Sequence, residues 1–250
     1  MLLDLDGTLY AGDEPVPGAV DTLAVLRERG TTLRFLTNTD SRPPETVLDE
    51  LASYGFDVQP DELFTPVVAA EQLLDGLAEV RLHTLVAPSV RECFARFRGA
   101  PPYTHLLVGD CREALNYDAL DAAFRALRGG AELVALQRGR YYKRADGDHV
   151  DAGAVVAGLE YAAEVEATVV GKPSRDFFEL CLRSANADAK DSVVVGDDVS
   201  TDVAGGRAAG LRTVLVRTGK YADTPDGAAR DADHVIDSIA DLPGLLDGLK

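Results

Sequence analysis

The chain of 250 residues is long enough to bury a sizeable core, as one large domain or as two smaller ones. Its formal net charge of −17 argues against a nucleic-acid partner, because a polyanion would be repelled over most of the surface. No apolar run approaches the length of a membrane span and no basic-then-apolar leader is present, so we expect a cytoplasmic protein with no membrane partner.

The balance of charged residues points to a salt-rich cytoplasm. Aspartate outnumbers glutamate and lysine is scarce, so arginine carries nearly all the positive charge. Salt would screen the mutual repulsion of surface carboxylates, because the Debye length falls to about 3 Å at 1 M ionic strength. A halophilic source is our hypothesis and an acidic mesophilic protein is the alternative; melting temperatures against KCl separate them. Cys93, Cys111 and Cys181 are widely spaced and fit the ordinary thiols of a reducing compartment.

The first ten residues predict a strand that ends in two carboxylates. An apolar run leads to Asp4 and Asp6, and Gly7 lets the chain leave the strand in a tight turn. Because side chains alternate along a strand, Asp4 and Asp6 are expected to face the same way and Leu5 to face the interior. Two acids this close favour a bound Mg²⁺, which prefers oxygen ligands. The alternative is an acidic turn that only faces water.

The next segments predict a parallel βαβ unit. Apolar residues recur at helical spacing over 19–29, and a short apolar strand follows at 32–36. That strand ends at Thr37 and Asn38. Because right-handed crossovers set neighbouring strand ends side by side, Thr37 is expected to reach whatever Asp4 holds.

Two helices, at 43–54 and 66–79, lead to a second alternation of strands and helices that has no acid pair at a strand end. The elements expected in this block are strands at 82–87, 104–108 and 132–136, helices at 89–97, 117–127 and 154–163, and a β-hairpin at 139–147. We interpret 81–170 as an inserted domain, and 1–80 together with 171–250 as the core domain.

The original sheet is expected to resume at 167–170, which presents Lys172 at the end of a strand, although a lysine there is commonly a solvated strand end. Another apolar strand, at 192–196, leads to Asp197 and Asp198. Asp202 follows as a helix-start acid, for which capping is the simpler role. The elements expected after Lys172 are helices at 173–182 and 203–210 and a last internal strand at 211–216, and the apolar segments 235–236 and 242–249 are expected to finish the domain.

Together these strand ends predict one site for phosphoryl transfer. A carboxylate such as Asp4 can attack a phosphate only if the repulsion between the two anions is cancelled, which Mg²⁺ and a lysine would do. A hydroxyl and an amide would donate hydrogen bonds to the phosphate oxygens. An acid two residues further on, Asp6, could protonate the departing oxygen and later accept a proton from water.

The motifs resemble those of the haloacid dehalogenase (HAD) superfamily of phosphohydrolases. The four family motifs correspond to Asp4-Leu5-Asp6-Gly7-Thr8, Thr37-Asn38, Lys172 and Gly196-Asp197-Asp198. The insertion is similar in place and size to the C2-type cap of the NagD-type, 4-nitrophenylphosphatase-like subgroup. Val170-Gly171-Lys172-Pro173 and Arg217-Thr218-Gly219-Lys220-Tyr221 look especially like the branch of phospholysine phosphohistidine inorganic pyrophosphate phosphatase. The implied fold is α/β, a Rossmann-like parallel-sheet core with an inserted α/β cap.

The resemblance implies a Mg²⁺-dependent phosphatase that works through an aspartyl-phosphate intermediate. Its implied substrates are small phosphate monoesters, phosphoanhydrides or phosphoramidates of metabolites, and a homodimer through the cap is also expected by resemblance. Asp4 would be the nucleophile and a metal ligand, and Asp6 the acid/base with its backbone carbonyl on the metal. Asp197 would be the third protein ligand.

Further roles follow from the same resemblance. The residues expected to contact the phosphate are Thr37, Asn38 and Lys172. The residues expected to hold the metal ligands in position, without binding the metal themselves, are Asp198 and Asp202. Only three residues precede Asp4, where the family usually has a longer first strand, so either this strand is clipped or the natural start lies upstream.

Three other interpretations share part of the pattern. A signalling receiver also gathers acids, a threonine and a lysine around Mg²⁺, but Asp6 and the large insertion favour turnover over storage of the phosphoryl group. Dehalogenase chemistry needs neither Mg²⁺ nor Asp6. A phosphomutase differs only in what attacks the intermediate, and it stays open.

Overall fold

The computed structural model describes residues 1–144 and 146–248 and divides into two compact units. The first unit comprises Met1–Thr37, Glu45–Phe64 and Lys172–Lys250, and the second comprises Asn38–Pro44 and Thr65–Gly171. The expected domain boundaries at 80/81 and 170/171 stay a prediction. In this division helix α3 (Pro66–Asp75) lies in the second unit.

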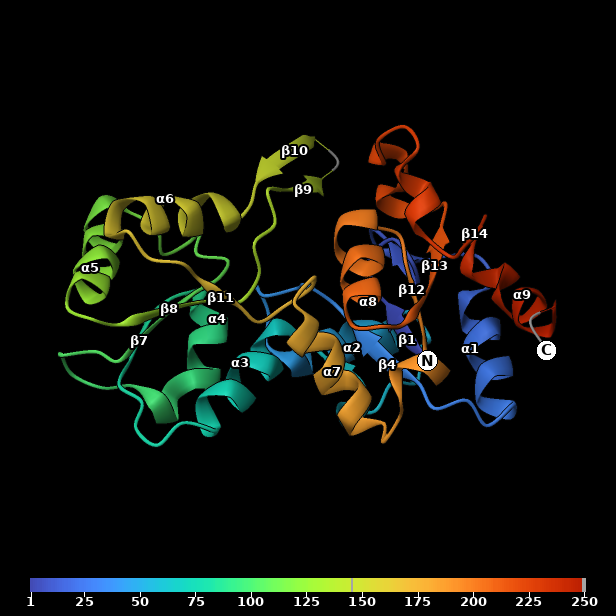
Figure 1. The fold of residues 1–250 in the computed structure, drawn as a ribbon, viewed down its shortest axis with the longest axis horizontal. Coiled ribbons are helices and arrows are strands. Elements are labelled where there is room, and N and C mark those ends of the chain that lie inside the picture. The colour runs from blue at the N-terminus through green and yellow to red at the C-terminus, as the bar shows by residue number, and fades with distance from the viewer. Residues whose placement is uncertain (145, 249–250) are drawn as a thin grey trace. The chain divides into compact units, whose positions relative to one another are not determined.

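The first unit is built on a six-stranded parallel sheet with the order β14-β13-β12-β1-β4-β5 (Figure 1). Its strands are β1 (Leu2–Asp4), β4 (Arg34–Leu36), β5 (Leu63–Phe64), β12 (Val193–Gly196), β13 (Arg212–Val216) and β14 (His234–Ile236). The chain winds outward from β1 through β4 to β5, and then in the other direction from β12 to β14. The winding therefore reverses between β1 and β12, and the carboxyl ends of strands at such a point are where open α/β sheets bind ligands.

Helices cover both faces of this sheet. They are α1 (Ala19–Glu28), α2 (Pro44–Ser53), α7 (Arg175–Ser184), α8 (Ala204–Ala208) and α9 (Leu242–Gly248). Helices α1 and α9 contribute to the buried cluster that holds Val195 and Val214. Helix α8 lies on the opposite face, because Gly206 lies against Val194 and Thr213, the alternate residues of the same strands. A short hairpin, β2 (Tyr10–Ala11) with β3 (Glu14–Pro15), follows the first turn.

The second unit has its own four-stranded parallel sheet, in the order β11-β8-β7-β6. Its strands are β6 (Leu82–Leu85), β7 (His105–Val108), β8 (Glu132–Ala135) and β11 (Thr168–Val169). Helices α5 (Tyr117–Arg128) and α6 (Gly153–Ala163) contribute to one apolar core with β7 and β8. A hairpin, β9 (Tyr141–Arg144) with β10 (Gly147–Val150), lies between β8 and α6 in the chain. The remaining helix, α4 (Pro88–Arg91), continues into a 3-10 helix at Glu92–Phe97.

The predicted α/β class with a Rossmann-like parallel sheet is confirmed, but one strand was assigned to the wrong sheet. Segment 167–170 was expected to rejoin the first sheet, whereas β11 pairs with β8 in the second. Apolar composition identifies a strand without identifying its neighbour, which explains the error. Strand β5 was missed because two residues, Leu63 and Phe64, are too few to show a pattern.

Within the part of the chain that the structure describes, no helix combines the length and the apolarity needed to cross a membrane.

Candidate active site

The candidate site lies in the first unit, where the winding of the sheet reverses. Asp4 is the last residue of β1 and stands opposite Leu36 on β4, so Thr37 follows at the same edge of the sheet. On the other side of β1, strand β12 ends at Gly196 and is followed directly by Asp197. The local sequence explains this placement, because each buried apolar strand is followed at once by a polar residue.

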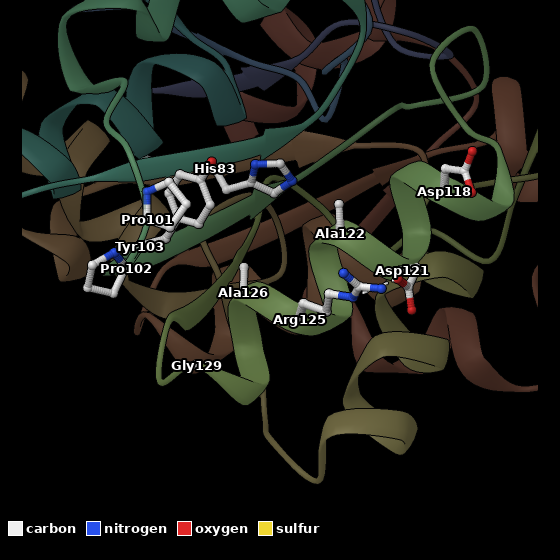
Figure 2. A pocket seen from close by; sticks show the side chains of 10 residues that line it. All are labelled: His83, Pro101, Pro102, Tyr103, Asp118, Asp121, Ala122, Arg125, Ala126 and Gly129. Carbon is white, nitrogen blue, oxygen red and sulfur yellow. Dashed lines mark ion pairs between the residues drawn. The ribbon is translucent and has the colours of Figure 1, made fainter.

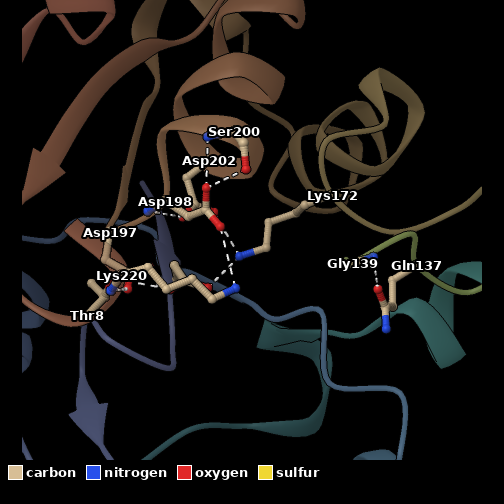
Figure 3. Close-up of polar contacts among 10 residues, drawn as sticks. Thr8, Gln137, Gly139, Lys172, Asp197, Asp198, Ser200, Asp202 and Lys220 are labelled. Atoms are coloured by element: carbon tan, nitrogen blue, oxygen red, sulfur yellow. Dashed lines mark hydrogen bonds and ion pairs between the residues drawn. The ribbon is translucent and has the colours of Figure 1, made fainter. Parts of the chain in front are cut away.

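Lys172 holds two of the carboxylates together, as Figure 3 shows in part. Its ammonium pairs with Oδ1 of Asp4 and lies 2.8 Å from Oδ1 of Asp202. All three side chains are buried. The hydroxyl of Thr8 donates a hydrogen bond of 3.2 Å to the other oxygen of Asp4. Both oxygens of Asp4 therefore have a protein partner.

Burial and charge act against each other at this cluster. Burial alone would lower the pKa of Lys172, but the charges of Asp202 and Asp4 raise it, so the lysine is held as an ammonium. Burial raises the pKa of Asp4, against the opposing effect of Lys172. Burial likewise raises the pKa of Asp202 to about 7, in spite of Lys172, and the charge of Asp4 adds to the rise.

Asp197 lies beside this pair in a space kept open by glycine. Its Oδ2 accepts the backbone N–H of Lys220 at 2.6 Å, and its side chain is 3% exposed. A Cβ on Gly7 or on Gly219 would collide with the same oxygen, and both glycines have positive φ, at 85° and 57°. Burial, followed by the charges of Asp4 and Asp202, raises the pKa of Asp197 well above its usual value.

Asp198 has a different environment from its neighbour. Its Oδ1 accepts hydrogen bonds from the N–H and the hydroxyl of Ser200, at 2.8 and 2.6 Å, and its Oδ2 lies 3.4 Å from the ammonium of Lys220 (Figure 3). Burial would raise the pKa of Asp198, but the bonds from Ser200 and the charge of Lys220 outweigh it and lower the pKa. The N–H of Asp198 donates to Oδ2 of Asp202 at 3.2 Å. The hydrogen bonds of Asp198 and Asp202 therefore fix the conformation of the loop after β12.

The remaining predicted residues lie in different places. Asp6 is exposed, not buried beside Asp4, because the strand ends at Asp4 and the strict alternation expected for Asp6 ends with it. Its charge still raises the pKa of Asp4, which places it nearby. Thr37 is buried, and its N–H donates to the carbonyl of Phe64 at 3.1 Å. Asn38 belongs to the second unit, where its side-chain oxygen lies against Gly171.

The structure also brings to the candidate site residues for which no individual role was predicted. Thr8 and Lys220 contact the carboxylates directly, and the hydroxyl of Thr218 donates to the carbonyl of Gly7, which ties the two glycine turns together. The turn at Gly7 was predicted from the residues themselves, whereas the turn at Gly219 belongs to a motif noted only as family resemblance. A glycine next to a threonine in each motif was the available signal.

The donor set fits a divalent cation of the Mg²⁺ type. Asp4, Asp197 and Asp202 each offer a carboxylate oxygen, all within 4.8 Å of one another, and all three side chains are buried. The ammonium of Lys172 pairs with two of these acids, and that of Lys220 acts on Asp197 and Asp202 from further away, so three carboxylates face two ammonium groups. Hard oxygen donors and excess negative charge suit Mg²⁺. Both oxygens of Asp202 are bonded within the protein, to Lys172 and to the N–H of Asp198, as both oxygens of Asp4 are to Lys172 and Thr8, so all three acids stay candidate ligands.

A hollow of about 790 Å³ lies elsewhere, in the second unit, between α5 and the segment before β7 (Figure 2). His83 and Tyr103 form one wall with ring centroids 4.9 Å apart, and Arg125 pairs with Asp121 at 2.8 Å on the helix. None of the carboxylates of the candidate site lines it.

Comparisons with known proteins identify the family of this chain. The family model described as haloacid dehalogenase-like hydrolase matches residues 1–97, and the HAD-hydrolase-like model matches residues 169–242. Haloacid dehalogenase-like hydrolase domain-containing protein 2 of Homo sapiens is 39% identical over 221 residues, which cover 88% of this chain and 85% of the relative. Phospholysine phosphohistidine inorganic pyrophosphate phosphatase of Danio rerio is 36% identical over 254 residues, covering 98% and 93%.

Solved structures are similar over nearly the whole chain. The 4-nitrophenylphosphatase of Thermotoga maritima has a TM-score of 0.88 at 26% identity and covers 97% of this chain and 95% of its own. NagD of E. coli K-12 has a TM-score of 0.84 at 26% identity and covers 96% of each chain.

Proposed function

Because this chain belongs to the haloacid dehalogenase-like hydrolase family, we propose that it is a phosphatase that hydrolyses small phosphate esters through a phosphorylated Asp4. The observation that carries the proposal is the buried Asp4 at the end of the central strand, with Lys172 and Asp197 beside it. The phosphatase names of several relatives and structural neighbours support the same reaction class.

In the first step an oxygen of Asp4 attacks the phosphorus, and the bond from phosphorus to the leaving oxygen breaks. Asp6, which is exposed and two residues away, gives its proton to that oxygen. The ammonium of Lys172 balances the charge of Asp4 while the second anion approaches, and the hydroxyl of Thr8 holds the other carboxylate oxygen. Thr37 would contact the phosphate.

In the second step water attacks the phosphorus of the acyl phosphate and gives its proton to the Asp6 carboxylate. The bond from phosphorus to Asp4 breaks, which frees the carboxylate and releases inorganic phosphate. An exposed Asp6 suits this step because it can meet water, whereas the buried Asp4 cannot exchange partners as easily.

A Mg²⁺ ion held by Asp4, Asp197 and the backbone carbonyl of Asp6 would neutralise the transferring phosphoryl group and fix its orientation. On this proposal Asp202 is a positioning residue that holds Lys172, and Asp198 fixes the loop after β12. The second unit would correspond to the cap domain, and the substrate would be a small phosphorylated metabolite.

The test is the release of phosphate from 4-nitrophenyl phosphate by wild type, Asp4→Asn and the control Asp13→Asn, which changes an exposed acid in the turn between β2 and β3. We expect Mg²⁺-dependent release by wild type and the control, and a loss of more than about tenfold in Asp4→Asn, or over 1.4 kcal/mol in the barrier. Asp4→Asn activity within tenfold of wild type would remove Asp4 as the nucleophile. Transfer to an added phosphoryl acceptor instead of water would favour a phosphomutase.

A further inference from the structure

The loop that follows β13 contacts both of the turns that carry candidate metal ligands. Thr218 stands two residues after the end of β13 and directly precedes a short 3-10 helix, Gly219–Asp223. Its hydroxyl donates to the carbonyl of Gly7, in the turn after β1. The backbone N–H of Lys220 donates to Oδ2 of Asp197 at 2.6 Å (Figure 3). All of these residues belong to the first unit.

Thr218 does not behave as threonines at the start of a helix usually do. The side-chain oxygen of such a threonine ordinarily accepts the backbone N–H of the second or third helical residue. Among the described residues Thr218 makes no bond of this kind, and its hydroxyl donates to Gly7 instead. The N–H of the second helical residue, Lys220, donates to Asp197. Both groups that would ordinarily cap this helix are therefore directed to the candidate site.

The bond from Thr218 helps to fix the backbone on both sides of Gly7. The N–H of Gly7 donates to the carbonyl of Tyr10 at 2.7 Å, within the same turn, while its carbonyl is held by Thr218. The peptide between Asp6 and Gly7 is trans, so its N–H and its C=O point in opposite directions. The direction of the Gly7 N–H therefore also sets the direction of the Asp6 carbonyl, which is proposed to bind Mg²⁺.

The turn after β1 and the loop after β13 pack backbone against backbone. A Cβ on Gly219 would collide with the Cα of Gly7 and with Oδ2 of Asp197. A displacement of either segment would therefore be passed to the other and to the carboxylate between them.

We propose that Thr218 is a positioning residue of the active site. Its hydroxyl holds the turn after β1 against Asp197, so that the Asp6 carbonyl and the Asp197 carboxylate can bind the same cation. The inference rests on the proposed function, which places Mg²⁺ between these two groups. Thr218 touches neither the metal nor the phosphate, and it acts through the carbonyl of Gly7.

The test compares Thr218→Val, which keeps the shape of the side chain without its hydroxyl, with Thr218→Ser, which keeps the hydroxyl. Thr218→Ala is a second variant without the hydroxyl. The readout is the Kd of Mg²⁺, obtained from the rise of the melting temperature with Mg²⁺ concentration in the absence of substrate. The Kd should increase about tenfold or more in Thr218→Val and Thr218→Ala and stay within about twofold of wild type in Thr218→Ser, because residues that orient metal ligands act on metal affinity.

Thr46→Val is the matched control, because Thr46 is an exposed threonine on α2 of the same unit. It should leave the Kd of Mg²⁺ unchanged. Urea unfolding in EDTA checks that each variant is folded, and a merely structural role of Thr218 would lower the free energy of unfolding there without changing the Kd. An unchanged Kd in Thr218→Val and Thr218→Ala, or an equal increase in Thr218→Ser, would overturn the inference.

The proposed function is checked separately, by the release of phosphate from 4-nitrophenyl phosphate at saturating Mg²⁺. If wild type binds Mg²⁺ but releases no phosphate, the phosphatase proposal fails, and the Kd values of the variants still decide the role of Thr218. If Mg²⁺ does not raise the melting temperature of wild type, the inference itself is overturned.

Discussion

The ammonium of Lys172 lies 2.8 Å from a carboxylate oxygen of Asp202, and both side chains are almost fully buried. Asp202 sits on a π-helical turn, Val199–Val203, and its other oxygen accepts the N–H of Asp198. One acid thus joins the loop after β12 to the lysine that contacts Asp4. Lys172 therefore contacts Asp4 although the strand that precedes it in the chain, β11, belongs to the second sheet.

Asp202→Asn should reduce kcat by about tenfold or more, a loss of ~1.4 kcal/mol in transition-state stabilisation. The amide can still accept the N–H of Asp198, but it no longer opposes the charge of Lys172. Asp188→Asn is the control, because it removes an exposed acid 3.9 Å from Lys190, a pair worth little. Equal steady-state rates for Asp202→Asn and Asp188→Asn would show that Asp202 does not position the lysine.

Much of this site follows from local sequence, because the end of a buried strand is a local property. Asp4, Thr37 and Asp197 each follow an apolar run, and parallel pairing of β4, β1 and β12 places them at one edge. Lys172 was also singled out as a strand-end residue, and it follows three residues after the end of β11. Its strand was assigned to the wrong sheet, since pairing partners depend on contacts distant in sequence.

The contacts made by loops could not be predicted in the same way. The role of Asp202 as the partner of Lys172 depends on a one-turn π-helix, and the position of Lys220 depends on a turn at Gly219. Asp6 was expected to face the same way as Asp4, but β1 ends at Asp4, so the strict alternation of a strand does not extend to Asp6. Such loop geometry is set by packing across the sheet.

Gly7→Ala should destabilise the protein and reduce activity, whereas Gly12→Ala should only destabilise it slightly. Both glycines have positive φ, at 85° and 62°, so each alanine costs about 1 kcal/mol in backbone strain. At Gly7 the new Cβ would also collide with Asp197, while at Gly12 it meets no atom within 4 Å. Urea unfolding should therefore show an additional loss of about 1–3 kcal/mol for Gly7→Ala. Equal losses in the two variants would contradict the close approach to Asp197.

Mg²⁺ should raise the melting temperature of wild type, and Asp197→Asn should lose most of that increase. A ligand that binds only the folded state stabilises it by ~2.7 kcal/mol at a concentration of 100 times its Kd. The three acids of the donor set lie within 4.8 Å of one another, and a bound cation would relieve the repulsion between their carboxylates. Thermal denaturation with Mg²⁺ and with EDTA checks this, with Asp13→Asn as control. An undiminished Mg²⁺ effect in Asp197→Asn would exclude Asp197 as a ligand.

Asp40→Asn should stabilise the protein above neutral pH and have less effect in acid. Burial and the charges of Asp151 and Asp110 raise the pKa of Asp40 in the folded protein to about 7, from an ordinary value of 3.8, so between these values the folded state holds the proton more tightly. The contribution of Asp40 to the free energy of unfolding therefore falls as the pH rises through this window, and the loss is complete above about 7. The free-energy advantage of Asp40→Asn over wild type should grow, on the order of 2 kcal/mol, from about pH 5 to pH 8.

Urea unfolding of both proteins across this range measures that difference, in which the titrating groups that do not interact with Asp40 cancel. The asparagine keeps an acceptor for the N–H of Asp110, so the comparison isolates the charge. A difference that stays constant with pH would mean that Asp40 is already ionised in the folded protein throughout.

The most direct test of the account is to locate the phosphoryl group during turnover. Asp6→Asn should still accept it from 4-nitrophenyl phosphate but should transfer it slowly to water, because no acid/base assists the second step. After acid quenching, mass spectrometry of the N-terminal peptide should show a phosphoryl group that fragmentation assigns to Asp4. A phosphoryl group on any other residue, or undiminished turnover by Asp6→Asn with no labelled peptide, would contradict the central claim.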